Sequence, residues 1–592
     1  MDKFYTVEKN VQAVIGLMKA HGVKKVVVSP GTTNITLVGS LQADSWFELY
    51  SSVDERSAAY IACGLSAETG EPVALSCTGA TASRNYIPGL TEAFYRRLPV
   101  LAITSTQHPG RIGSYTAQVL DRSQQLNDMV VYSAQAMIPH TPEDEWALNV
   151  ELNKAFIALR KNGGGPVHIN LMTTYSKDFT VKELPTQRII KHIGYHDNLP
   201  ELKKGHIGIK VGAHTAWNDE LTKSVNRFCQ LYGAVVFCEH VSNYKGSYKV
   251  SPALLAIQEQ YKSPCLNVET EIHIGFVEGV GIRIHPDEVW RVNPDGEIRD
   301  KTHRTTHVFQ MEEVDFFKAY IDLAENSAVH NNTDYLSTET SEHEFLKLCQ
   351  EECRKVVSKI PELPFSNAWI AQQTSMKIPE GSVLHLGILN TMRTWNFFDI
   401  PDSVLCYANT GGFGIDGDIS SLVGASLAHP DKLYFGIVGD LAFFYDMNVL
   451  GNRHLGKNIR LMLINNGRGT EFRNYQHPAA RFGVAADPYM AAAGHYGKQS
   501  RDLIRHYAVD LGFEYLSADS KETYMENIER FLIPEFTEHP ILFEVFTDSK
   551  DESDVLKMLY NIETSTKGTA KKIVKDVLGE KGTAALKGLL KK

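Results

Sequence analysis

The hydrophobic positions of the chain fall into short, nearly continuous apolar runs separated by longer amphipathic stretches. Runs that are apolar on both faces are typical of buried parallel strands. Between them, the stretch 55–70 has the spacing of a helix that ends at a glycine. This alternation is typical of a doubly wound α/β sheet. The first runs cover residues 24–31, 72–79, 99–107 and 166–171.

The same alternation recurs twice further along the chain, with a helix pattern at 218–233 and a polar, turn-rich stretch at 327–344 that we interpret as a linker. The middle runs cover residues 206–214, 234–240 and 271–277, and the last runs cover 382–390, 433–440, 459–466 and 540–548. The sequence therefore predicts an α/β fold with three doubly wound parallel-sheet domains in series. The predicted ranges are 1–188, 189–345 and 346–552, followed by a basic tail at 553–592.

Composition narrows the class of protein. A chain of 592 residues is too long for one core, and its 43% hydrophobic and 22% charged residues are ordinary for a globular protein. The sequence has no apolar run long enough to span a bilayer and no signal-peptide pattern, so we expect a cytoplasmic protein. Its eight scattered cysteines are then expected to be free thiols. A net charge of -10 argues against general nucleic-acid binding.

The tail departs from this acidic average. Residues 567–592 hold eight lysines against Asp576 and Glu580, a local excess of six positive charges. Apolar residues at helical spacing suit an amphipathic helix attracted to anionic lipid, which would place the protein peripherally at the inner membrane surface. The alternative interpretation is a solvated basic end, or a helix that docks on an acidic patch of the protein's own oligomer.

Polar side chains follow two of the last apolar runs. Asp440 comes directly after one run, and Asn465 and Asn466 end the next one along the chain. Because ligands bind at the carboxyl ends of parallel strands, neighbouring strand ends would bring Asp440 and Asn466 together. A carboxylate and an amide oxygen suit a hard cation such as Mg²⁺. The simpler alternative is that these polar residues only end two strands.

The segment GDL-x(23)-NN at 439–466 resembles the diphosphate–metal motif of thiamine diphosphate (ThDP) enzymes. In that family the Asp, the second Asn and a backbone carbonyl two residues further on ligate Mg²⁺ or Mn²⁺. The resemblance assigns these roles to Asp440, Asn466 and the carbonyl of Arg468. Gly439 and Leu441 flank the aspartate, and Leu441 replaces the family's usual glycine.

The segment VDERSAAYIACGLSAETG at 53–70 resembles the one that carries the essential glutamate of the same family, here Glu55. In the family this carboxylate hydrogen-bonds the aminopyrimidine ring and promotes the tautomer that removes the thiazolium C2 proton. A surface charge in the first turn of a helix, favoured by the helix dipole, is the structural alternative.

A closer resemblance covers about residues 10 to 550 and is to the 2-succinyl-5-enolpyruvyl-6-hydroxy-3-cyclohexene-1-carboxylate (SEPHCHC) synthases of the menaquinone pathway. These decarboxylate 2-oxoglutarate and add the resulting carbanion to isochorismate. The resemblance implies a homodimer or homotetramer with active sites at the subunit interface, and a catalytic role for Gln118. It implies further cofactor contacts at Thr78, Gly414, Ile415 and Phe472, with Ile415 supporting the bent cofactor. It rests on SPGTTN (29–34), DERSAA (54–59), CTGATASRNYIPGLTEA (77–93), AQVLDR (117–122), IHIG (272–275), NTGGFGIDG (409–417) and GDLAFFYDMN (439–448).

The substrate positions depart from that family. The family has arginine at the positions of Thr33, Gln107, Trp395 and Thr410, and it has an apolar residue at the position of Glu471. Each arginine–carboxylate contact is worth about 1.5–3 kcal/mol, so their loss predicts a changed substrate. Other donors are available in Arg84, His108, Arg111, Arg393, Arg473 and His477, of which His108 and Arg393 lie in segments that face the cofactor in the family. The tentative substrate residues are Thr33, Gln107, His108, Asn390, Arg393, Trp395, Thr410 and Glu471.

We therefore predict an enzyme that uses ThDP and Mg²⁺ to decarboxylate a 2-oxo acid donor and to transfer the acyl-anion equivalent to an acceptor, with altered specificity. Three alternatives stay open: a genuine SEPHCHC synthase with rearranged arginines, a simple 2-oxo acid decarboxylase, and a catalytically silent partner protein. A nucleotide-binding α/β protein is disfavoured because the sequence has neither a P-loop nor a G-x-G-x-x-G after its first strand. The middle domain has no fingerprint for a second cofactor, so no functional FAD is expected.

Overall fold

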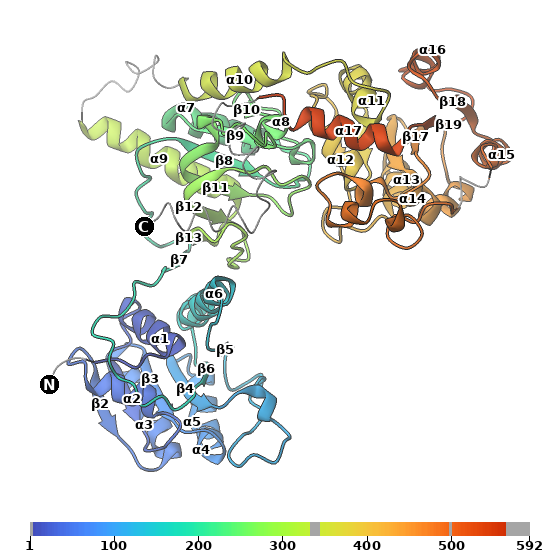
Figure 1. Cartoon of the computed structure of the whole chain (residues 1–592). Coiled ribbons are helices and arrows are strands. Elements are labelled where there is room, and N and C mark those ends of the chain that lie inside the picture. The colour runs from blue at the N-terminus through green and yellow to red at the C-terminus, as the bar shows by residue number, and fades with distance from the viewer. Residues whose placement is uncertain (1–3, 332–343, 496–499, 564–592) are drawn as a thin grey trace, which may run out of the picture. The chain divides into compact units, whose positions relative to one another are not determined.

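The structure is a computed structural model that describes residues 4–331, 344–495 and 500–563 (Figure 1). The chain divides into two compact units, residues 1–199 with 289–310 and residues 200–288 with 311–592. Its strands form three sheets of six, seven and six strands that follow one another along the sequence. The predicted α/β class with three parallel sheets in series is confirmed.

The first sheet lies in the first unit and has the strand order β2-β1-β3-β4-β6-β5, with every pairing parallel. Its strands are β1 (Lys25–Val28), β2 (Glu48–Ser51), β3 (Val73–Cys77), β4 (Val100–Thr106), β5 (Tyr132–Ala136) and β6 (Val167–Met172). The helices around it are α1 (Lys9–Ala20), α2 (Ile35–Gln42), α3 (Glu55–Thr69), α4 (Thr81–Arg84), α5 (Ile87–Tyr95) and α6 (Pro142–Ala158).

Both faces of this sheet are buried, as the continuous apolar runs predict. Successive residues of one strand enter different cores: Val26 packs in a cluster with α1 and α6, whereas Val27 packs in a cluster with α3 and α5. Since side chains alternate between the two faces of a strand, a strand buried on both sides must be apolar throughout. This explains why the central strands are visible as unbroken runs.

Helix α3 begins and ends where its sequence predicts. The side chain of Asp54 accepts a hydrogen bond from the backbone N–H of Arg56 at 2.9 Å, which caps the first turn. The helix ends at Gly70, which has a φ of 68° and therefore suits glycine. The capped start fixes Glu55 in the first turn, next to the carboxyl end of β2.

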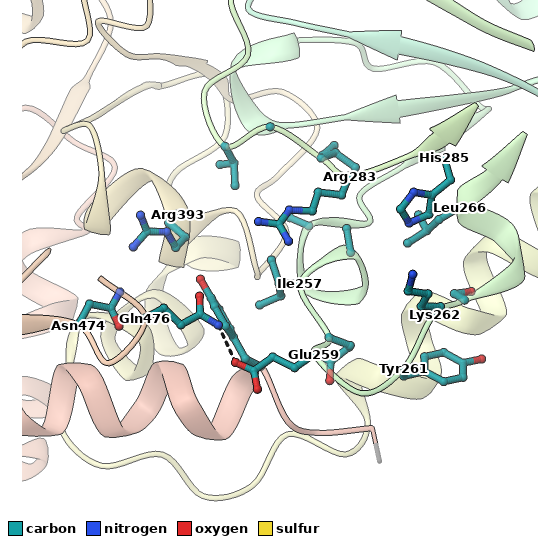
Figure 2. A pocket seen from close by; sticks show the side chains of 18 of the residues that line it. Ile257, Glu259, Tyr261, Lys262, Leu266, Arg283, His285, Arg393, Asn474 and Gln476 are labelled. Atoms are coloured by element: carbon teal, nitrogen blue, oxygen red, sulfur yellow. Dashed lines mark hydrogen bonds between the residues drawn. The ribbon is translucent and has the colours of Figure 1, made fainter. Parts of the chain in front are cut away.

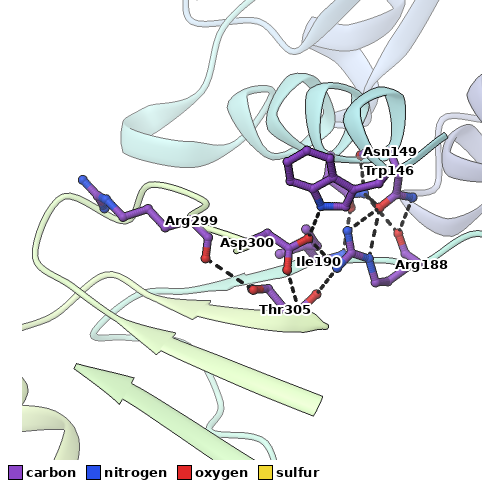
Figure 3. Close-up of polar contacts among 8 residues, drawn as sticks. Trp146, Asn149, Arg188, Ile190, Arg299, Asp300 and Thr305 are labelled. Atoms are coloured by element: carbon purple, nitrogen blue, oxygen red, sulfur yellow. Dashed lines mark hydrogen bonds and ion pairs between the residues drawn. The ribbon is translucent and has the colours of Figure 1, made fainter. Parts of the chain in front are cut away.

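A polar network joins residues 289–310 to the rest of the first unit (Figure 3). The buried Asp300 carboxylate pairs with Arg188 at 2.6 Å and accepts the indole N–H of Trp146 at 2.8 Å. It also accepts the backbone N–H of Thr305 at 2.8 Å, and Arg188 in turn donates to Asn149. The network ties this segment to α6.

The middle sheet has the strand order β10-β9-β8-β11-β12-β13-β7. Its strands are β7 (Lys191–Ile193), β8 (Ile207–Val211), β9 (Val235–Cys238), β10 (Lys249–Val250), β11 (Asn267–Ile274), β12 (His285–Val292) and β13 (Thr305–Phe309). The helices of this part are α7 (Asp219–Tyr232), α8 (Ala253–Ala256), α9 (Glu313–Asn331) and α10 (Glu344–Val357).

The third sheet lies in the second unit and has the order β15-β14-β16-β17-β19-β18, again with every pairing parallel. Its strands are β14 (Val383–Leu386), β15 (Leu405–Tyr407), β16 (Tyr434–Gly439), β17 (Ile459–Asn465), β18 (Glu514–Ala518) and β19 (Ile541–Phe546). Its helices are α11 (Asn367–Thr374), α12 (Asn390–Trp395), α13 (Asp418–Ala428), α14 (Asp440–Asp446), α15 (Leu503–Asp510), α16 (Lys521–Phe531) and α17 (Ser549–Leu559).

The predicted linker is partly wrong, because α9 continues to Asn331 and α10 begins at Glu344. Residues 332–343 lie outside the described part of the chain. The lysine-rich stretch 567–592 also lies outside it, so the amphipathic-tail interpretation stays a prediction, as do the domain boundaries at 188, 345 and 552. No helix among the described residues has the length and apolarity needed to cross a membrane.

Candidate active site

Four neighbouring strands of the first sheet each lead into one of the predicted site residues. In sheet order these strands are β2, β1, β3 and β4. Because all are parallel, their carboxyl ends lie along one edge of the sheet, where α/β proteins bind ligands. The residues that follow them are, in the same order, Glu55, Thr33, Thr78 and Gln107.

Thr33 and Thr78 are brought into direct contact. Their hydroxyl oxygens lie 2.6 Å apart, and the Thr33 hydroxyl also accepts the backbone N–H of Gly79 at 3.0 Å. Gly31 makes this approach possible, since a Cβ at that position would lie 2.5 Å from the Cβ of Thr78. The residue that stands in place of a family arginine is thus buried and hydrogen-bonded within the protein.

Glu55 is half-buried in the first turn of α3, where the helix dipole favours a carboxylate. Its closest described partner is the side-chain amide of Asn85, which donates to Oε2 at 3.4 Å. This long contact leaves the carboxylate able to accept a stronger hydrogen bond from a ligand at the sheet edge.

The remaining predicted residues of the first unit surround this edge. Gln107 is half-buried and hydrogen-bonds the hydroxyl of Tyr175. His108 is exposed, and its Nδ1 accepts the backbone N–H of Gly110 at 3.0 Å. Gln118 is exposed in the loop between β4 and β5, with a φ of 65° that a non-glycine residue rarely adopts.

Sequence reasoning missed Arg122, which anchors the loop that carries Gln118. Arg122 is buried, and its guanidinium donates to Ser83 Oγ, to the carbonyl of Ser105 and to Asn170 Oδ1 at 2.9–3.0 Å. Burial lowers its pKa to about 10, so the side chain stays charged at neutral pH. The DR pair after the predicted Gln118 was visible in the sequence, but nothing there indicated that the arginine is internal.

The second unit repeats this arrangement at the third sheet. The neighbouring strands β15, β14, β16 and β17 lead into all the remaining predicted residues. In that order they are followed by Thr410, Gly414 and Ile415; by Asn390, Arg393 and Trp395; by Asp440 and Leu441; and by Asn466, Arg468, Glu471 and Phe472.

Asp440 and Asn466 lie at adjacent strand ends, as predicted. The register pairs Gly439 of β16 with Ile464 of β17, so the two residues that follow the strands share one edge. Asp440 is 5% exposed and Asn466 is 9% exposed. Burial raises the pKa of Asp440 to about 7, although backbone N–H groups, including that of Leu441, donate to its carboxylate.

The amide oxygen of Asn466 is buried and has no hydrogen-bond partner among the described residues. Its neighbour Asn465 differs, since the Asn465 side chain donates to Glu544 at 2.7 Å within the core. A buried carboxylate and an orphaned amide oxygen are costly without a compensating group. A divalent cation bound between them would satisfy both, so these residues fit the metal and diphosphate end of ThDP.

The side chain of Arg468 is held away from this edge by Asp487, which accepts from it at 3.0 and 3.1 Å. This leaves its backbone as the part that could serve a metal. Leu441 packs toward Gly469, where a Cβ would lie 3.1 Å from the leucine Cδ1. Ile415 is half-buried and packs against the hydrophobic clusters of both faces of the third sheet.

The tentative substrate residues of this unit are largely committed to protein partners. Arg393 and Glu471 form a two-pronged ion pair with both N–O distances at 2.8 Å. Asn390 hydrogen-bonds the buried Glu552, and Thr410 is buried. Trp395 is 0% exposed and donates its indole N–H to Asn367 at 3.1 Å, a placement that does not support the predicted substrate contact. The ring of Phe472 packs edge-on against His477.

Comparison with known proteins agrees with this geometry. Residues 9–126 match the family model described as the thiamine pyrophosphate enzyme N-terminal TPP binding domain. This match and the relatives below relate the chain to the thiamine diphosphate-dependent enzymes. The relationship is consistent with the polar residues that the two six-stranded sheets carry along one edge each.

Three similar proteins that align with almost the whole chain have the same name. The chain is 29% identical over 591 residues to a protein of Phocaeicola vulgatus, with 94% of this chain and 99% of the relative covered. It is 28% identical over 579 residues to a Bacteroides fragilis protein and 29% identical over 577 residues to one of Bacteroides thetaiotaomicron, with the same coverage. All three are named 2-succinyl-5-enolpyruvyl-6-hydroxy-3-cyclohexene-1-carboxylate synthase. This ThDP-dependent enzyme is therefore related to SEPHCHC synthases.

Proposed function

We propose that the protein uses ThDP and Mg²⁺, or Mn²⁺, to decarboxylate a 2-oxo acid and to join the remaining acyl unit to a carbonyl carbon or an activated alkene of an acceptor. The donor loses CO₂, the electron pair of its broken C–C bond forms the new C–C bond to the acceptor, and the acceptor takes up a proton. The observation that carries this proposal is the pairing of buried Asp440 with the unpartnered amide oxygen of Asn466 at adjacent strand ends.

The residues of this chain divide the work of holding the cofactor. Asp440, Asn466 and the carbonyl of Arg468 would bind the metal and through it the diphosphate, because hard cations take oxygen ligands. Glu55 would accept a hydrogen bond from the aminopyrimidine ring, and Ile415 would support the cofactor from below. When bound, ThDP supplies a carbon nucleophile that adds to the donor carbonyl and accepts the electron pair released with CO₂.

We further propose that the enzyme does not make SEPHCHC. Thr33 and Thr78 satisfy each other, Trp395 is internal, and Glu471 neutralises Arg393. These contacts support a site with fewer free cations than several substrate carboxylates require. The competing candidate is a genuine SEPHCHC synthase, which the similarity along 94% of the chain favours. Robust turnover of 2-oxoglutarate with isochorismate would establish that candidate instead.

Glu55 and Asp440 belong to different compact units. We propose that the complete active site forms between two copies of the chain, in a homodimer or homotetramer. Mixing Glu55→Gln protein with Asp440→Ala protein tests this, because only a mixed dimer with shared sites contains one intact site. We expect each variant alone to be inactive and re-assembled mixtures to regain up to about a quarter of wild-type turnover. If no mixture regains activity while mixed dimers form, each subunit holds its own site.

The function itself is tested by titrating ThDP with Mg²⁺ into cofactor-free protein and into Glu55→Gln protein, followed by a CO₂-release screen over 2-oxo acids. We expect both proteins to bind the cofactor and only wild type to release CO₂. Release of free aldehyde without an acceptor would identify a simple decarboxylase. Binding without any CO₂ release would favour a silent partner protein, and no binding at all would contradict the proposal.

The predicted cytoplasmic location and the lipid contact of the tail stay proposals. Pelleting the full chain with anionic and with neutral vesicles, beside a version that ends at Glu563, tests the lipid contact. The proposal requires that only the full chain pellets, and only with anionic vesicles.

A further inference from the structure

A cavity of about 550 Å³ in the second unit borders the candidate active site (Figure 2). It shares Arg393 and Glu471 with the strand ends of the third sheet. Its other walls come from residues 253–266 and 280–285 of the middle part of the chain and from Tyr560. A molecule in this cavity would therefore contact two of the predicted substrate residues.

The charged side chains that line the cavity leave one positive charge in excess, which one negative charge on a ligand would neutralise. Lys262, Arg283 and Arg393 are cationic, and Glu259 and Glu471 are carboxylates, which leaves an excess of one positive charge when the lining histidines are neutral. Glu471 is the ion-pair partner of Arg393. Among the described residues, neither Arg283 nor Lys262 has a carboxylate partner within ion-pair distance. A ligand with several carboxylates would meet two fixed carboxylates here and too few free cations.

Arg283 is held in place by its own loop. The carboxylate of Glu239 accepts the backbone N–H groups of Gly279, Val280 and Gly281 at 2.5–2.9 Å, which fixes the chain just before the arginine. Ile282 and Ile284 are buried on either side of Arg283, so the arginine points the other way, into the cavity (Figure 2). A cation whose backbone is fixed loses less entropy when it binds an anion.

The remaining polar lining suits hydroxyl groups. Asn474 is 6% exposed, and its amide oxygen has no hydrogen-bond partner in the described part of the chain. Gln476 and Glu259 lie on the same wall, joined by a hydrogen bond of 2.6 Å (Figure 2). Amide and carboxylate oxygens accept hydrogen bonds from hydroxyls, so this wall can bind a ligand that carries several of them.

We propose that this cavity binds the acceptor, and that the acceptor is a polyhydroxylated compound with one anionic group, carboxylate or phosphate, which Arg283 binds. The term acceptor rests on the proposed function. The binding of such a compound in the cavity does not depend on the proposed function, because every residue that lines the cavity belongs to the protein itself.

The test is isothermal titration of four probes into the full chain loaded with ThDP and Mg²⁺: D-gluconate, D-glucose 6-phosphate, D-glucose and succinate. The first two combine hydroxyls with an anionic group, and the last two have only one of these features. We expect gluconate or glucose 6-phosphate to bind at least about tenfold more tightly than glucose and succinate. The tighter of the two identifies the anionic group as carboxylate or phosphate.

Two variants and one control sharpen the test. Arg283→Gln should weaken binding of the preferred probe about tenfold or more, and Arg283→Lys should restore part of it because the charge returns without the two-pronged geometry. Arg304→Gln, at an exposed position that does not line the cavity, should bind like wild type. ThDP titrations should be unchanged in all three.

Several outcomes would overturn the proposal. Succinate or glucose binding as tightly as gluconate and glucose 6-phosphate would exclude the combined chemistry. Probe binding that is insensitive to Arg283→Gln would exclude this cavity, and so would no probe binding at all. The same titrations in cofactor-free protein separate the two hypotheses: if ThDP fails to bind but the probes still bind through Arg283, only the proposed function is wrong.

Discussion

The first and third sheets have the same strand order, and each carries its predicted site residues at the ends of the same four strands. They differ in how the polar groups at those ends are satisfied. In the first unit, Thr33 and Thr78 bond each other and Glu55 stays half-buried. In the second unit, Asp440 is buried with a raised pKa and the amide oxygen of Asn466 has no described partner.

This difference indicates what the edge formed by the carboxyl ends of the strands contributes to the site in each sheet. A folded protein rarely leaves a buried acceptor unpaired, so we propose that the second edge binds a cation and its ligands. At the first edge the hydroxyls of Thr33 and Thr78 satisfy each other, and we propose that Glu55 offers its carboxylate to the cofactor ring. One topology thus serves two tasks because the residues after the strands differ, while the sheets themselves stay alike.

The largest effect is expected for Asn466→Leu, which should disrupt the proposed cofactor site at the carboxyl ends of the strands of the third sheet. We expect the affinity for ThDP with Mg²⁺ to fall at least about 100-fold, since one metal ligand is lost. The unfolding temperature without cofactor should stay near the wild-type value, because no protein hydrogen bond to the amide oxygen is removed. Titration calorimetry and thermal unfolding measure the two quantities.

The adjacent Asn465→Leu is the matched control. It removes the hydrogen bond to buried Glu544, so we expect a loss of about 1–3 kcal/mol of stability without cofactor. If Asn465→Leu and Asn466→Leu have the same effects on stability and on cofactor affinity, the contrast between the structural and the ligand asparagine is wrong.

Glu552 provides a pH test of the second edge, because it holds Asn390 and Asn367. Burial raises its pKa from 4.5 to about 7, so the folded protein keeps a proton that the unfolded chain releases between these values. The contribution of Glu552 to stability must therefore fall as the pH rises from about 4.5 to 7, by at most about 3 kcal/mol.

Glu552→Gln cannot titrate, so the stability of wild type relative to this variant should fall over that window and stay constant above pH 7. Denaturant unfolding of both proteins from pH 4 to 8 gives this difference. Burial also raises the pKa values of Asp440 and Asp418 to about 7, and their contributions cancel because both proteins contain them. A difference that is independent of pH would contradict the raised pKa.

The central strands of both sheets could be predicted from sequence, and the edge strands could not. The apolar runs correctly predicted β1, β3, β4 and β6 and their counterparts β14, β16, β17 and β19. The missed strands β2, β5, β15 and β18 are the edges of the two sheets. An edge strand pairs with only one neighbouring strand and is more exposed, as β2 is. Its sequence can therefore include polar residues and shows no continuous apolar run.

Site residues could be predicted where a strand end fixes them, but their partners could not. Asp440 and Asn466 were predicted to meet because parallel strands align their ends. The pair of Arg393 with Glu471 joins residues that are 78 positions apart, through loops whose path no local pattern determines. The burial of Trp395 depends on the same packing. Sequence therefore located the edges of the site but not the distribution of charge within it.

Glu471→Gln sharpens the comparison of charge between the two edges. The change frees Arg393 and adds one positive charge to the lining of the cavity, where it also favours a donor whose second carboxylate reaches Arg393. We expect the ratio of kcat/KM for 2-oxoglutarate to that for a monocarboxylic 2-oxo acid to rise about tenfold. Arg393→Met in the same background should return the ratio to its wild-type value, and a ratio unchanged by Glu471→Gln would show that Arg393 does not face the donor.

The smallest effect is expected at the first edge. Thr33→Val removes a buried hydroxyl that bonds Thr78 and accepts from Gly79, so it should cost about 1 kcal/mol of stability and leave ThDP affinity nearly unchanged. Thr78→Val should act similarly on stability. Because the two hydroxyls satisfy each other, the double variant should cost less than the sum of the single ones, which denaturant unfolding of the four proteins measures. Additive losses would mean that each hydroxyl serves a separate partner, and the first edge would then be as incomplete without a ligand as the second.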